Sequence, residues 1–337
     1  MDIGIIMGPR NHPDHPYPLA EVYQDYIEDV VRAERLGFDN AWVGEHRMTD
    51  CQWTPSPMTV LAAMATRTST IRLGTSVLCL PFHHPLRAAE DVVALDILSN
   101  GRFNFGFGAG SQFEEFRTFQ IDSKDRMSRT YESAAFIRKA LSTDEEFDWE
   151  GKYYTIPKVR FTTRPVQEEI PFYAGAIGPT SVRKAGEYGY HLIANSNPGW
   201  TEGVAAGGHD QSKLKAQGLI AVVVAETEEK AWEASEEAVL YFSNFYILRR
   251  QLDGSQPDPS RALTKEDLIN RKFSPASSVA VGTPEQVLEQ LSAVYKAQPA
   301  GQTGFAIQMR SPGMKTADVE KSMNLFAEHV MPELRKL

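Results

Sequence analysis

One short segment carries three side chains that could act together in chemistry. Glu45, His46 and Arg47 follow an apolar run that ends at Val43, and they place a carboxylate, an imidazole and a guanidinium side by side. Histidine suits proton transfer near neutral pH, because its unperturbed pKa lies there. A lone histidine can equally be a structural hydrogen-bonding residue, and Glu45 can be a ligand contact or a partner for Arg47. His46 is therefore a candidate catalytic residue, and its position in the fold must decide between the two roles.

Two pairs of histidines raise the alternative of a metal hydrolase. His12 and His15 follow the first apolar run of the chain, and His83 and His84 follow the third. Imidazole is a common zinc ligand. Neither pair has the spacing of one intervening residue that places two side chains on the same face of a strand. The sequence therefore predicts no metal site.

Two loops could hold a ligand through backbone groups. Residues 99–110 lead from a helix end through an apolar strand into a run of glycines, but without the GxGxxG spacing of dinucleotide-binding loops. Glycine there can also simply relieve crowding. In the loop from Ala176 to Ser181, Gly178 lets a ligand approach the backbone, and a helix N-terminus attracts anions such as phosphate. Helix capping by the loop's own hydroxyl groups explains this second loop equally well.

The elements that hold these segments alternate between strand and helix. Four strands and three helices are predicted in the first third of the chain: strands at Ile3–Met7, Asn40–Val43, Ile71–Leu80 and Phe103–Phe107, and helices at Leu19–Leu36, Pro57–Arg67 and Pro85–Leu98. Such alternation with short connections implies a parallel sheet with right-handed crossovers. The candidate residues then lie at carboxyl ends of strands, where ligands bind in such folds.

The rest of the chain continues this pattern. It predicts strands at Pro171–Ala176, His191–Ala194, Gly218–Ala225 and Phe305–Met309, and helices at Phe113–Leu141 (interrupted), Pro179–Tyr188, Thr227–Arg249 and Ala317–Val330. Val279–Glu285 is expected to begin a further helix, capped by Thr283 with Pro284 as its first residue. About eight strands alternating with helices favour an α/β fold of the (β/α)8 TIM-barrel type with insertions, while an open doubly wound sheet is the alternative.

Two segments do not fit the barrel pattern. Residues 142–170 include an aromatic and basic stretch that is expected to pack outside the barrel, and residues 251–275 are polar and rich in Pro, Ser and Asp. A loop of that length in a compact protein is usually a lid or disordered. With no linker composition between the elements, we expect one barrel domain over residues 1–337, an excursion near 142–170 and a mobile lid near 251–275.

Composition narrows the class of partner. The 337 residues carry a formal net charge of −9, which argues against a nucleic-acid or anionic-membrane surface and favours a small-molecule partner. The N-terminus enters a strand without the features of a signal peptide, and no apolar run approaches membrane-spanning length. A cytoplasmic location is expected. Cys51 and Cys79 lack a CxxC spacing and are expected to be free thiols.

Several motifs in order resemble the bacterial-luciferase-like flavin-dependent monooxygenases. They are Gly37-Phe38-Asp39 leading to Trp42 and Glu45-His46, the run from Leu80-Pro81 and Pro85 through Ala89-Glu90-Asp91 and Leu95-Asp96 to Ser99–Phe103, and the C-terminal segments Val281–Glu285 and Leu325–Pro332. The similarity covers roughly residues 1–195 and 279–337. Matching several motifs in sequence order is far more specific than matching any one of them.

The resemblance implies a (β/α)8 barrel that uses reduced FMN as a co-substrate, supplied by a separate flavin reductase, and O2 to oxidise a small organic substrate. His46 matches the family's catalytic histidine, and Ser76-Val77 matches a pair joined by a non-proline cis peptide bond that contacts the flavin. A homodimer formed through helices of the N-terminal half is also implied. The residues expected to contact the cofactor are Glu45, Ser76, Val77, Gly108, Ala109, Ala176, Ile177, Gly178, Thr180 and Ser181.

This chain departs from luciferase itself at three of these positions. Gly108 and Ala109 stand where luciferase has a cysteine and a phosphate-binding arginine, and Ile177 replaces an acidic residue. Light emission is therefore not implied, and the phosphate charge must be met elsewhere, by Arg183 or by a residue of the weakly matching region. The room left at Gly108 is expected to shape substrate choice.

The reaction stays open between three alternatives. A monooxygenase could hydroxylate its substrate or carry out a Baeyer–Villiger oxidation. Some relatives instead use a deazaflavin as dehydrogenases or reductases, and luciferase heterodimers contain a noncatalytic partner subunit. The sequence does not identify the substrate, although four aromatic residues are candidates either for an apolar pocket or for the core: Trp53, Phe82, Phe113 and Trp200.

Overall fold

The main sheet is parallel throughout and closes on itself in the computed structural model, which describes residues 1–195, 197–250, 252–270, 279–298 and 302–337. The ring closes because β10 pairs with β9 on one side and with β12 on the other. In ring order the strands are β1 (Asp2–Met7), β2 (Asn40–Val43), β3 (Arg72–Thr75) with β4 (Leu78–Cys79), β5 (Phe103–Gly108), β8 (Phe172–Gly175), β9 (His191–Ile193), β10 (Ala216–Val224) and β12 (Gln302–Gln308). The predicted (β/α)8 barrel is confirmed, and the open sheet is not observed.

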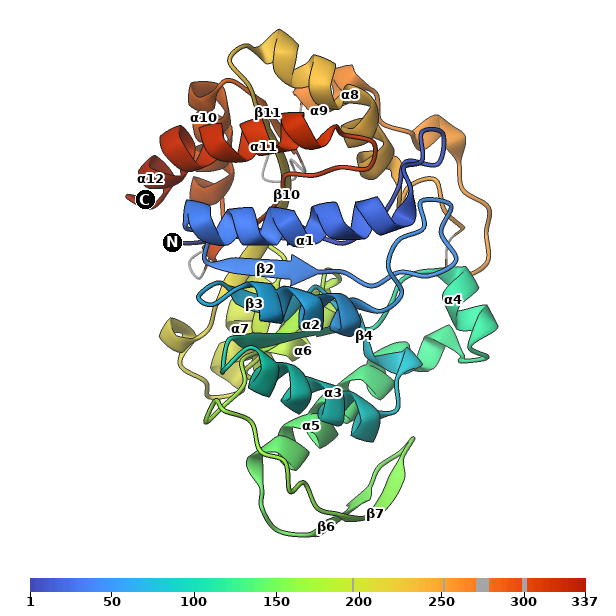
Figure 1. Ribbon diagram of the computed structural model, residues 1–337. Helices are drawn as coiled ribbons and strands as arrows, with labels where there is room; N and C mark the ends of the chain where they lie inside the picture. The colour runs from blue at the N-terminus through green and yellow to red at the C-terminus, as the bar shows by residue number, and fades with distance from the viewer. Residues whose placement is uncertain (196, 251, 271–278, 299–301) are drawn as a thin grey trace.

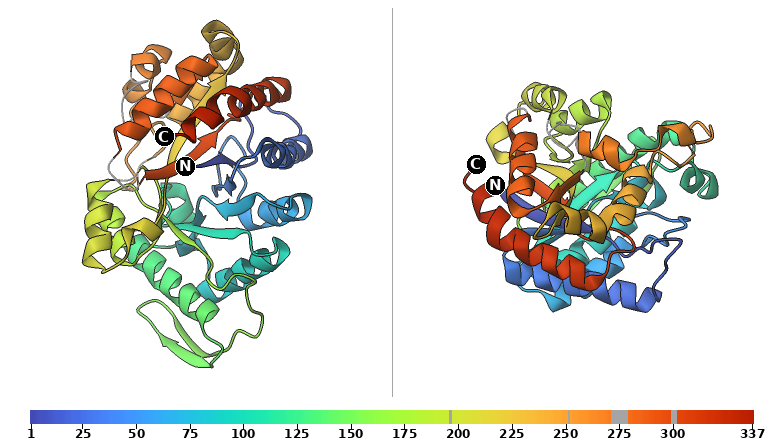
Figure 2. Two further views of the ribbon diagram at one scale, coloured as in Figure 1. Left: turned by 90° about the vertical axis from the view of Figure 1, so that its left-hand side faces the viewer. Right: turned by 90° about the horizontal axis from the view of Figure 1, so that it is seen from above.

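Helices surround the strands in both views of Figure 2. They are α1 (Leu19–Leu36), α2 (Pro57–Arg67), α3 (Pro85–Leu98), α4 (Phe113–Thr118), α5 (Arg126–Ser142), α6 (Pro179–Glu187), α7 (Pro198–Ala206), α8 (Glu228–Asn244), α9 (Lys265–Asn270), α10 (Pro284–Lys296), α11 (Thr316–Leu325) and α12 (Met331–Leu334). None of those described combines the length and apolar character needed to cross a membrane.

The strand β11 (Val279–Gly282) was not expected, because this segment was assigned to the start of a helix. Strand β10 is longer than β9, which pairs only with Ala216 and Gln217. The edge of β10 beyond that point is therefore available, and β11 pairs with it from Ala221 to Val224. Helix α10 does begin at Pro284 with Thr283 as its cap, as predicted, and Gln286 completes a capping box.

Helix α7 was also missed, for a reason that lies in tertiary packing. Its sequence contains glycines, which lower helix propensity. The glycines allow α6 and α7 to approach closely: a Cβ atom at Gly203 would lie 2.1 Å from the carbonyl oxygen of Arg183, and one at Gly186 would lie 2.4 Å from that of Trp200. Residues that weaken the helix locally are therefore required by its neighbour.

Two segments lie away from the ring of strands. The strands β6 (Phe147–Glu150) and β7 (Thr155–Val159) form a separate antiparallel hairpin, seen at the bottom of Figure 1. Of the expected lid, residues 252–270 are described and include α9, whereas residue 251 and residues 271–275 lie outside the described residues. Asn244 at the end of α8 fixes this segment, since its side chain accepts from the backbone N–H of Leu263 at 2.7 Å and donates to the Leu263 carbonyl oxygen at 3.0 Å.

The two faces of β5 show how the core is divided. The phenylalanine side chains of residues 103, 105 and 107 pack in the large hydrophobic cluster shared with the helices. The alternate residues point into the barrel: the Asn104 side chain donates to Asn40 Oδ1 at 3.2 Å, and a Cβ atom at Gly106 would meet the carbonyl oxygen of Thr75. This alternation brings Gly108, the last residue of β5, to the mouth of the barrel.

Candidate active site

A cavity of about 850 Å³ lies at the carboxyl ends of the barrel strands. Its volume is in the range of ligand-binding pockets. Most of the site residues predicted from the sequence line it: Glu45, His46, Ser76, Val77, Gly108, Ala109, Ala176, Ile177 and Ser181. Gly178 and Thr180 belong to the same loop as Ser181 but are not part of the lining. The barrel thus brings segments that are far apart in the sequence to one cavity.

His46 follows β2 and is held by neighbours on both sides of its ring. Its Nε2 atom lies 2.8 Å from the hydroxyl oxygen of Tyr246, and its ring packs edge-on against Trp53 with 4.5 Å between centroids. On the other side, Nδ1 lies 3.7 Å from Oε1 of Glu115, a buried carboxylate that also accepts from the backbone N–H of Arg47 at 2.9 Å. Desolvation raises the pKa of the Tyr246 hydroxyl, so this group stays protonated and can donate to His46.

Glu45 is a fixed anion beneath the cavity. Its carboxylate accepts from the backbone N–H of Cys79 at 2.5 Å and from His83 Nε2 at 2.8 Å, and it pairs with Arg47. Burial alone would raise the pKa of Glu45, but the hydrogen bond and charge of His83 and the charge of Arg47 outweigh burial and lower it. His83, one of the histidines behind the metal alternative, therefore serves this carboxylate. Among the described residues, no group of three His, Cys, Asp or Glu side chains could hold a metal ion.

The peptide bond between Ser76 and Val77 is cis, as the resemblance implied, and it separates β3 from β4. Two glycines make room for the Val77 side chain. A Cβ atom at Gly108 would lie 2.5 Å from Val77 Cγ2, and one at Gly175 would lie 2.6 Å from Val77 Cγ1. The room that Gly108 leaves is therefore filled by Val77 rather than left open to a substrate.

The loop from Ala176 to Ser181 joins β8 to α6 at the rim of the cavity. The Ser181 hydroxyl donates to the carbonyl oxygen of Gly178 at 2.8 Å, which is a local capping contact. The first backbone N–H groups of a helix have no partner within the helix, so the start of α6 presents donors at this rim. The Ile177 side chain is 90% exposed.

The arginine that follows β5 in the cavity wall is not the one that was expected. Arg183 pairs with Glu187 on the outer face of α6, with 3.0 Å between Nε and Oε1, and does not line the cavity. Arg126, at the start of α5, does line it and donates to the carbonyl oxygen of Ser123 at 2.9 Å. Arg126 lies within residues 1–195, where the resemblance was stated, but it belongs to none of the matching motifs, so no local pattern identified it.

Of the four candidate aromatic residues, only Trp53 lines the cavity. Phe82 packs against Phe116 with ring centroids 4.9 Å apart, and Phe113 lies beneath the guanidinium of Arg250. Trp200 is fully buried in α7. Phe82, Phe113 and Trp200 therefore pack against other side chains of the protein and do not form the cavity wall.

Three residues of the cavity wall had no signal in the sequence: Arg10, Tyr246 and Gln308. Arg10 lies in a proline-rich loop after β1, and Tyr246 lies beyond the end of α8. Their importance arises from contacts across the barrel mouth, since Tyr246 meets His46 and Arg10 meets Gln308 at the end of β12. The spacing of residues along the chain does not predict contacts between such distant positions.

Comparison with known proteins identifies a family and several relatives with similar sequences. The family described as "Luciferase-like monooxygenase" matches residues 1–300. Limonene 1,2-monooxygenase of Rhodococcus erythropolis is 28% identical over 348 residues, covering 98% of this chain and 86% of the relative. The oxygenase component of flavin-dependent trigonelline monooxygenase of Acinetobacter baylyi is 25% identical, covering 93% and 90%. F420-dependent glucose-6-phosphate dehydrogenase of Amycolatopsis mediterranei is 32% identical, covering 52% of this chain and 54% of the relative.

Solved structures share the fold over nearly the whole chain. Monooxygenase RslO1 from Streptomyces bottropensis superposes with a TM-score of 0.82 at 24% identity, covering 99% of this chain and 100% of that one. The oxygenating constituent of 3,6-diketocamphane monooxygenase from Pseudomonas putida, solved with FMN, gives 0.79 at 20% identity, covering 99% and 98%. An F420-dependent secondary alcohol dehydrogenase gives 0.76 at 22% identity, covering 99% of each chain. At these identities the likeness shows the fold.

Proposed function

The chain belongs to the luciferase-like monooxygenase family, and from that premise we propose that it is a monooxygenase that uses reduced FMN and O2 to oxidise a small organic substrate. The observation that carries the proposal is the convergence on one cavity of the paired His46 and Tyr246, the cis peptide bond at Ser76-Val77 and the start of α6. His46 follows β2, the cis bond follows β3, α6 begins after β8 and Tyr246 lies beyond α8, and together they would supply proton transfer, a ring contact and an anion site.

The residues present fit a flavin mononucleotide. Arg126 and the first turn of α6 would hold the phosphate, because a cation and free N–H groups attract an anion. The backbone at Ser76-Val77 and the end of β5 at Gly108-Ala109 would contact the ring. Bound reduced FMN would supply the electrons that activate O2.

The protein's own contribution is to hold the substrate, exclude water and move a proton. With the Tyr246 hydroxyl donating to Nε2, the neutral His46 ring carries its hydrogen on Nδ1, which lies 3.7 Å from Oε1 of Glu115. His46 would then hold or deliver a proton at the cavity surface. The Trp53 ring beside it shields this exchange from bulk water.

A specific test separates this proposal from its rivals. The purified chain is mixed anaerobically with reduced FMN or reduced F420, then with O2, while absorbance and dissolved oxygen are recorded. We expect reduced FMN to bind and its reoxidation by O2 to differ in rate from that of free reduced FMN, which reacts with O2 without protein. Binding of reduced F420 in place of reduced FMN would instead support the dehydrogenase alternative, which the F420-dependent relatives favour. A chain inert with both cofactors would fit a noncatalytic subunit.

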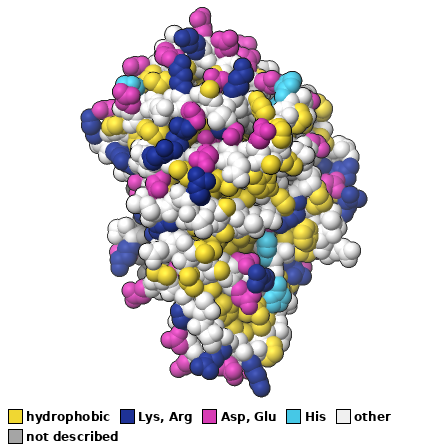
Figure 3. Space-filling view, viewed as in Figure 1, with side chains coloured by type: hydrophobic (Ala, Val, Ile, Leu, Met, Phe, Trp, Pro, Cys, Tyr) yellow, Lys and Arg dark blue, Asp and Glu magenta, His cyan; other side chains and the backbone are white. Residues whose placement is uncertain are grey.

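Two partners belong to the proposal. A separate flavin reductase would supply the reduced FMN, as the names of two relatives, an oxygenase component and an oxygenating constituent, suggest. A second copy of the chain would pack against helices of the N-terminal half. In Figure 3 hydrophobic side chains gather over the face where Figure 1 shows α1 to α3, and Ile97 and Leu98 at the end of α3 are 42% and 52% exposed. Multi-angle light scattering would give twice the chain mass.

Within the polar segment 251–275, the described residues 252–270 are proposed to close the mouth of the cavity. Leu252 lines the cavity, and Lys265 of α9 pairs with Glu236 of α8 at 2.6 Å, which ties this part of the segment to α8. Protection of this segment from proteolysis on cofactor binding would support a lid.

A further inference from the structure

Arg10 is a buried guanidinium that has no carboxylate partner among the described residues. Its side chain is 3% exposed, donates from Nη2 to the amide oxygen of Gln308 at 2.5 Å, and stacks on Trp53 and Phe242 at 4.1 and 4.9 Å from the ring centroids. The residues outside the described part of the chain include no Asp or Glu. Buried charges in proteins are normally paired, because an unpaired buried ion is costly. A missing anion is therefore indicated beside Arg10.

Further unpartnered polar groups surround the same guanidinium. Nε of Arg10 and Nε1 of Trp53 are buried and have no hydrogen-bond partner within the described protein. Both groups can only donate. Buried polar groups without partners call for a ligand or ordered water. A cluster rich in donors and poor in acceptors suits an anionic oxygen group.

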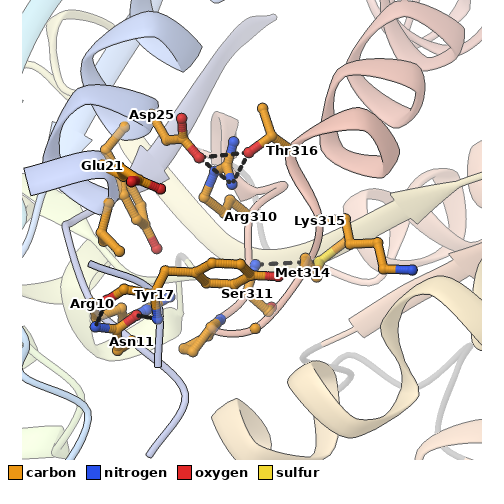
Figure 4. A pocket seen from close by; sticks show the side chains of 14 residues that line it. Arg10, Asn11, Tyr17, Glu21, Asp25, Arg310, Ser311, Met314, Lys315 and Thr316 are labelled. Carbon is orange, nitrogen blue, oxygen red and sulfur yellow. Dashed lines mark hydrogen bonds and ion pairs between the residues drawn. The ribbon is translucent and has the colours of Figure 1, made fainter. Parts of the chain in front are cut away.

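Arg10 borders two cavities, and their charges differ. The smaller, of about 280 Å³, lies beside α1, and Figure 4 shows Glu21 and Asp25 reaching it from that helix. Arg310 on its wall is already bound to Asp29 through two hydrogen bonds of 2.5 and 3.0 Å. Carboxylates there would repel a second anion.

The groups of the larger cavity that contact Arg10 are uncharged. They are the aromatic rings of Trp53 and Phe242 and the amide of Gln308. Glu45, which also lines it, is already paired with Arg47 and His83. The electrostatic environment therefore places the missing anion on this side.

We propose that the substrate is an organic acid whose carboxylate is held by Arg10, with an apolar or aromatic body that reaches His46. This inference rests on the proposed function. The cofactor contacts proposed above lie between β3 and β4, at the end of β5 and at the starts of α5 and α6, whereas Arg10 follows β1, with His46 after β2 between them. Trp53 touches both, since it stacks under Arg10 and packs against His46. The acid would therefore bind at one end of this aromatic surface and be oxidised near the other.

The test measures binding without turnover. Isothermal titration calorimetry compares three acids with their neutral amides: benzoate with benzamide, phenylacetate with phenylacetamide, and cinnamate with cinnamamide. We expect at least one acid to bind about tenfold or more tightly than its amide, as a charge-assisted hydrogen bond requires. Arg10→Gln should remove that preference. Trp53→Phe, which keeps the ring but removes Nε1–H, should weaken it, and this second variant keeps the test usable if Arg10→Gln misfolds.

Arg126→Gln is the matched control, because Arg126 lines the same cavity on the opposite side. It should keep the preference for the acid and weaken binding of FMN but not of riboflavin, which lacks the phosphate. The proposal is overturned if acids and amides bind equally, if no acid has a Kd below about 10 mM, or if Arg10→Gln retains the preference for the acid. Loss of reduced-FMN affinity in Arg10→Gln without any acid preference in the wild type would assign the guanidinium to the cofactor instead.

The two proposals can fail separately. Acid binding is measured without cofactor, so a preference for the acid together with exclusive use of F420 would reject the FMN-dependent monooxygenase and retain the acid site. Binding of reduced FMN with a protein-dependent rate of its reoxidation by O2, together with equal binding of acids and amides, would do the reverse.

Discussion

Glu45 and His46 are neighbours in the chain but have different surroundings. The Glu45 carboxylate is bound on every side and its pKa is lowered, so it serves as a permanent anion that fixes the end of β2. His46 contacts the cavity, with Nε2 beside the Tyr246 hydroxyl that can donate to it and Nδ1 beside the Glu115 carboxylate. Two adjacent residues thus divide structural and chemical roles.

Substitution of His46 tests the chemical role. We expect His46→Gln to lower the rate of substrate oxidation by about 10²–10⁴-fold, the usual contribution of a positioned acid or base, while reduced-FMN affinity stays unchanged. Tyr246→Phe should give a smaller loss, because the ring stays and only the hydroxyl partner of Nε2 is removed. Single-turnover kinetics with a flavin-binding titration measure both quantities. Unchanged oxidation in His46→Gln with intact flavin binding would contradict the assignment.

Gly108 provides a second test at the residue scale. The Cβ atom of Gly108→Ala would overlap the Val77 side chain, so we expect the free energy of unfolding to fall by about 1–3 kcal/mol, as overpacking usually costs. In a Val77→Ala background the overlap disappears, and the same substitution should cost much less. Urea unfolding of the four proteins in this double-mutant cycle gives the coupling energy. An equal loss in both backgrounds would show that Val77 is not the limiting neighbour.

At the scale of elements, a few long side chains fasten strand ends to helix ends. Arg102, just before β5, donates from Nε to the carbonyl oxygen of Ser99 at 2.7 Å and from Nη1 to that of Ile71 at 2.6 Å. Its Nη2 atom donates to the carbonyl oxygens of Ala65 and Thr68 in the last turn of α2 and just after it. One guanidinium therefore hydrogen-bonds the free carbonyl groups at the end of α2 and joins this helix to the start of β5.

Removing this cation should weaken the whole barrel. We expect Arg102→Met to lower the free energy of unfolding by about 3 kcal/mol, because several charge-assisted hydrogen bonds are lost and carbonyl groups remain unpaired. Arg87→Met is the matched control: the Arg87 side chain is 69% exposed on α3, and its surface ion pairs should contribute less than about 1 kcal/mol. Urea unfolding of both variants measures the difference, and similar losses would contradict the role given to Arg102.

At the scale of the molecule, the barrel closes at a titratable residue. His191 begins β9, the strand that meets β10, and its Nδ1 accepts from the backbone N–H of Lys215 at 2.9 Å. Burial, and then the charges of Lys215, Arg138 and Arg72, lower the pKa of His191 to about 4. The closure therefore requires the neutral imidazole.

This shift gives the stability a pH dependence. The unfolded chain takes up a proton at His191 near pH 6.5, whereas the folded chain does so only near pH 4, so stability falls as pH falls through that window. We expect wild type to lose roughly 2–3 kcal/mol more than His191→Gln between pH 7 and pH 4. Urea unfolding at several pH values measures this, with the exposed His209→Gln as control. Identical pH profiles for wild type and His191→Gln would exclude the effect.

The sequence by itself determined the elements whose signals are local. Helices α1, α2 and α3 have the predicted bounds, because Gly37 ends the first in a left-handed conformation and Pro57 and Pro85 begin the other two. The alternation of such elements predicted the barrel, and placement at strand ends predicted that His46 and the loop after β8 would share a cavity.

Only the tertiary structure decided what depends on contacts between distant residues. Strand β11 exists because β10 extends beyond β9, and α7 packs against α6 because Gly203 and Gly186 allow the two helices to approach closely. Arg10 and Tyr246 join the site through partners about 300 and 200 positions away in the chain. Periodicity and capping act over a few residues, whereas closing a barrel brings together side chains whose separation along the sequence leaves no pattern.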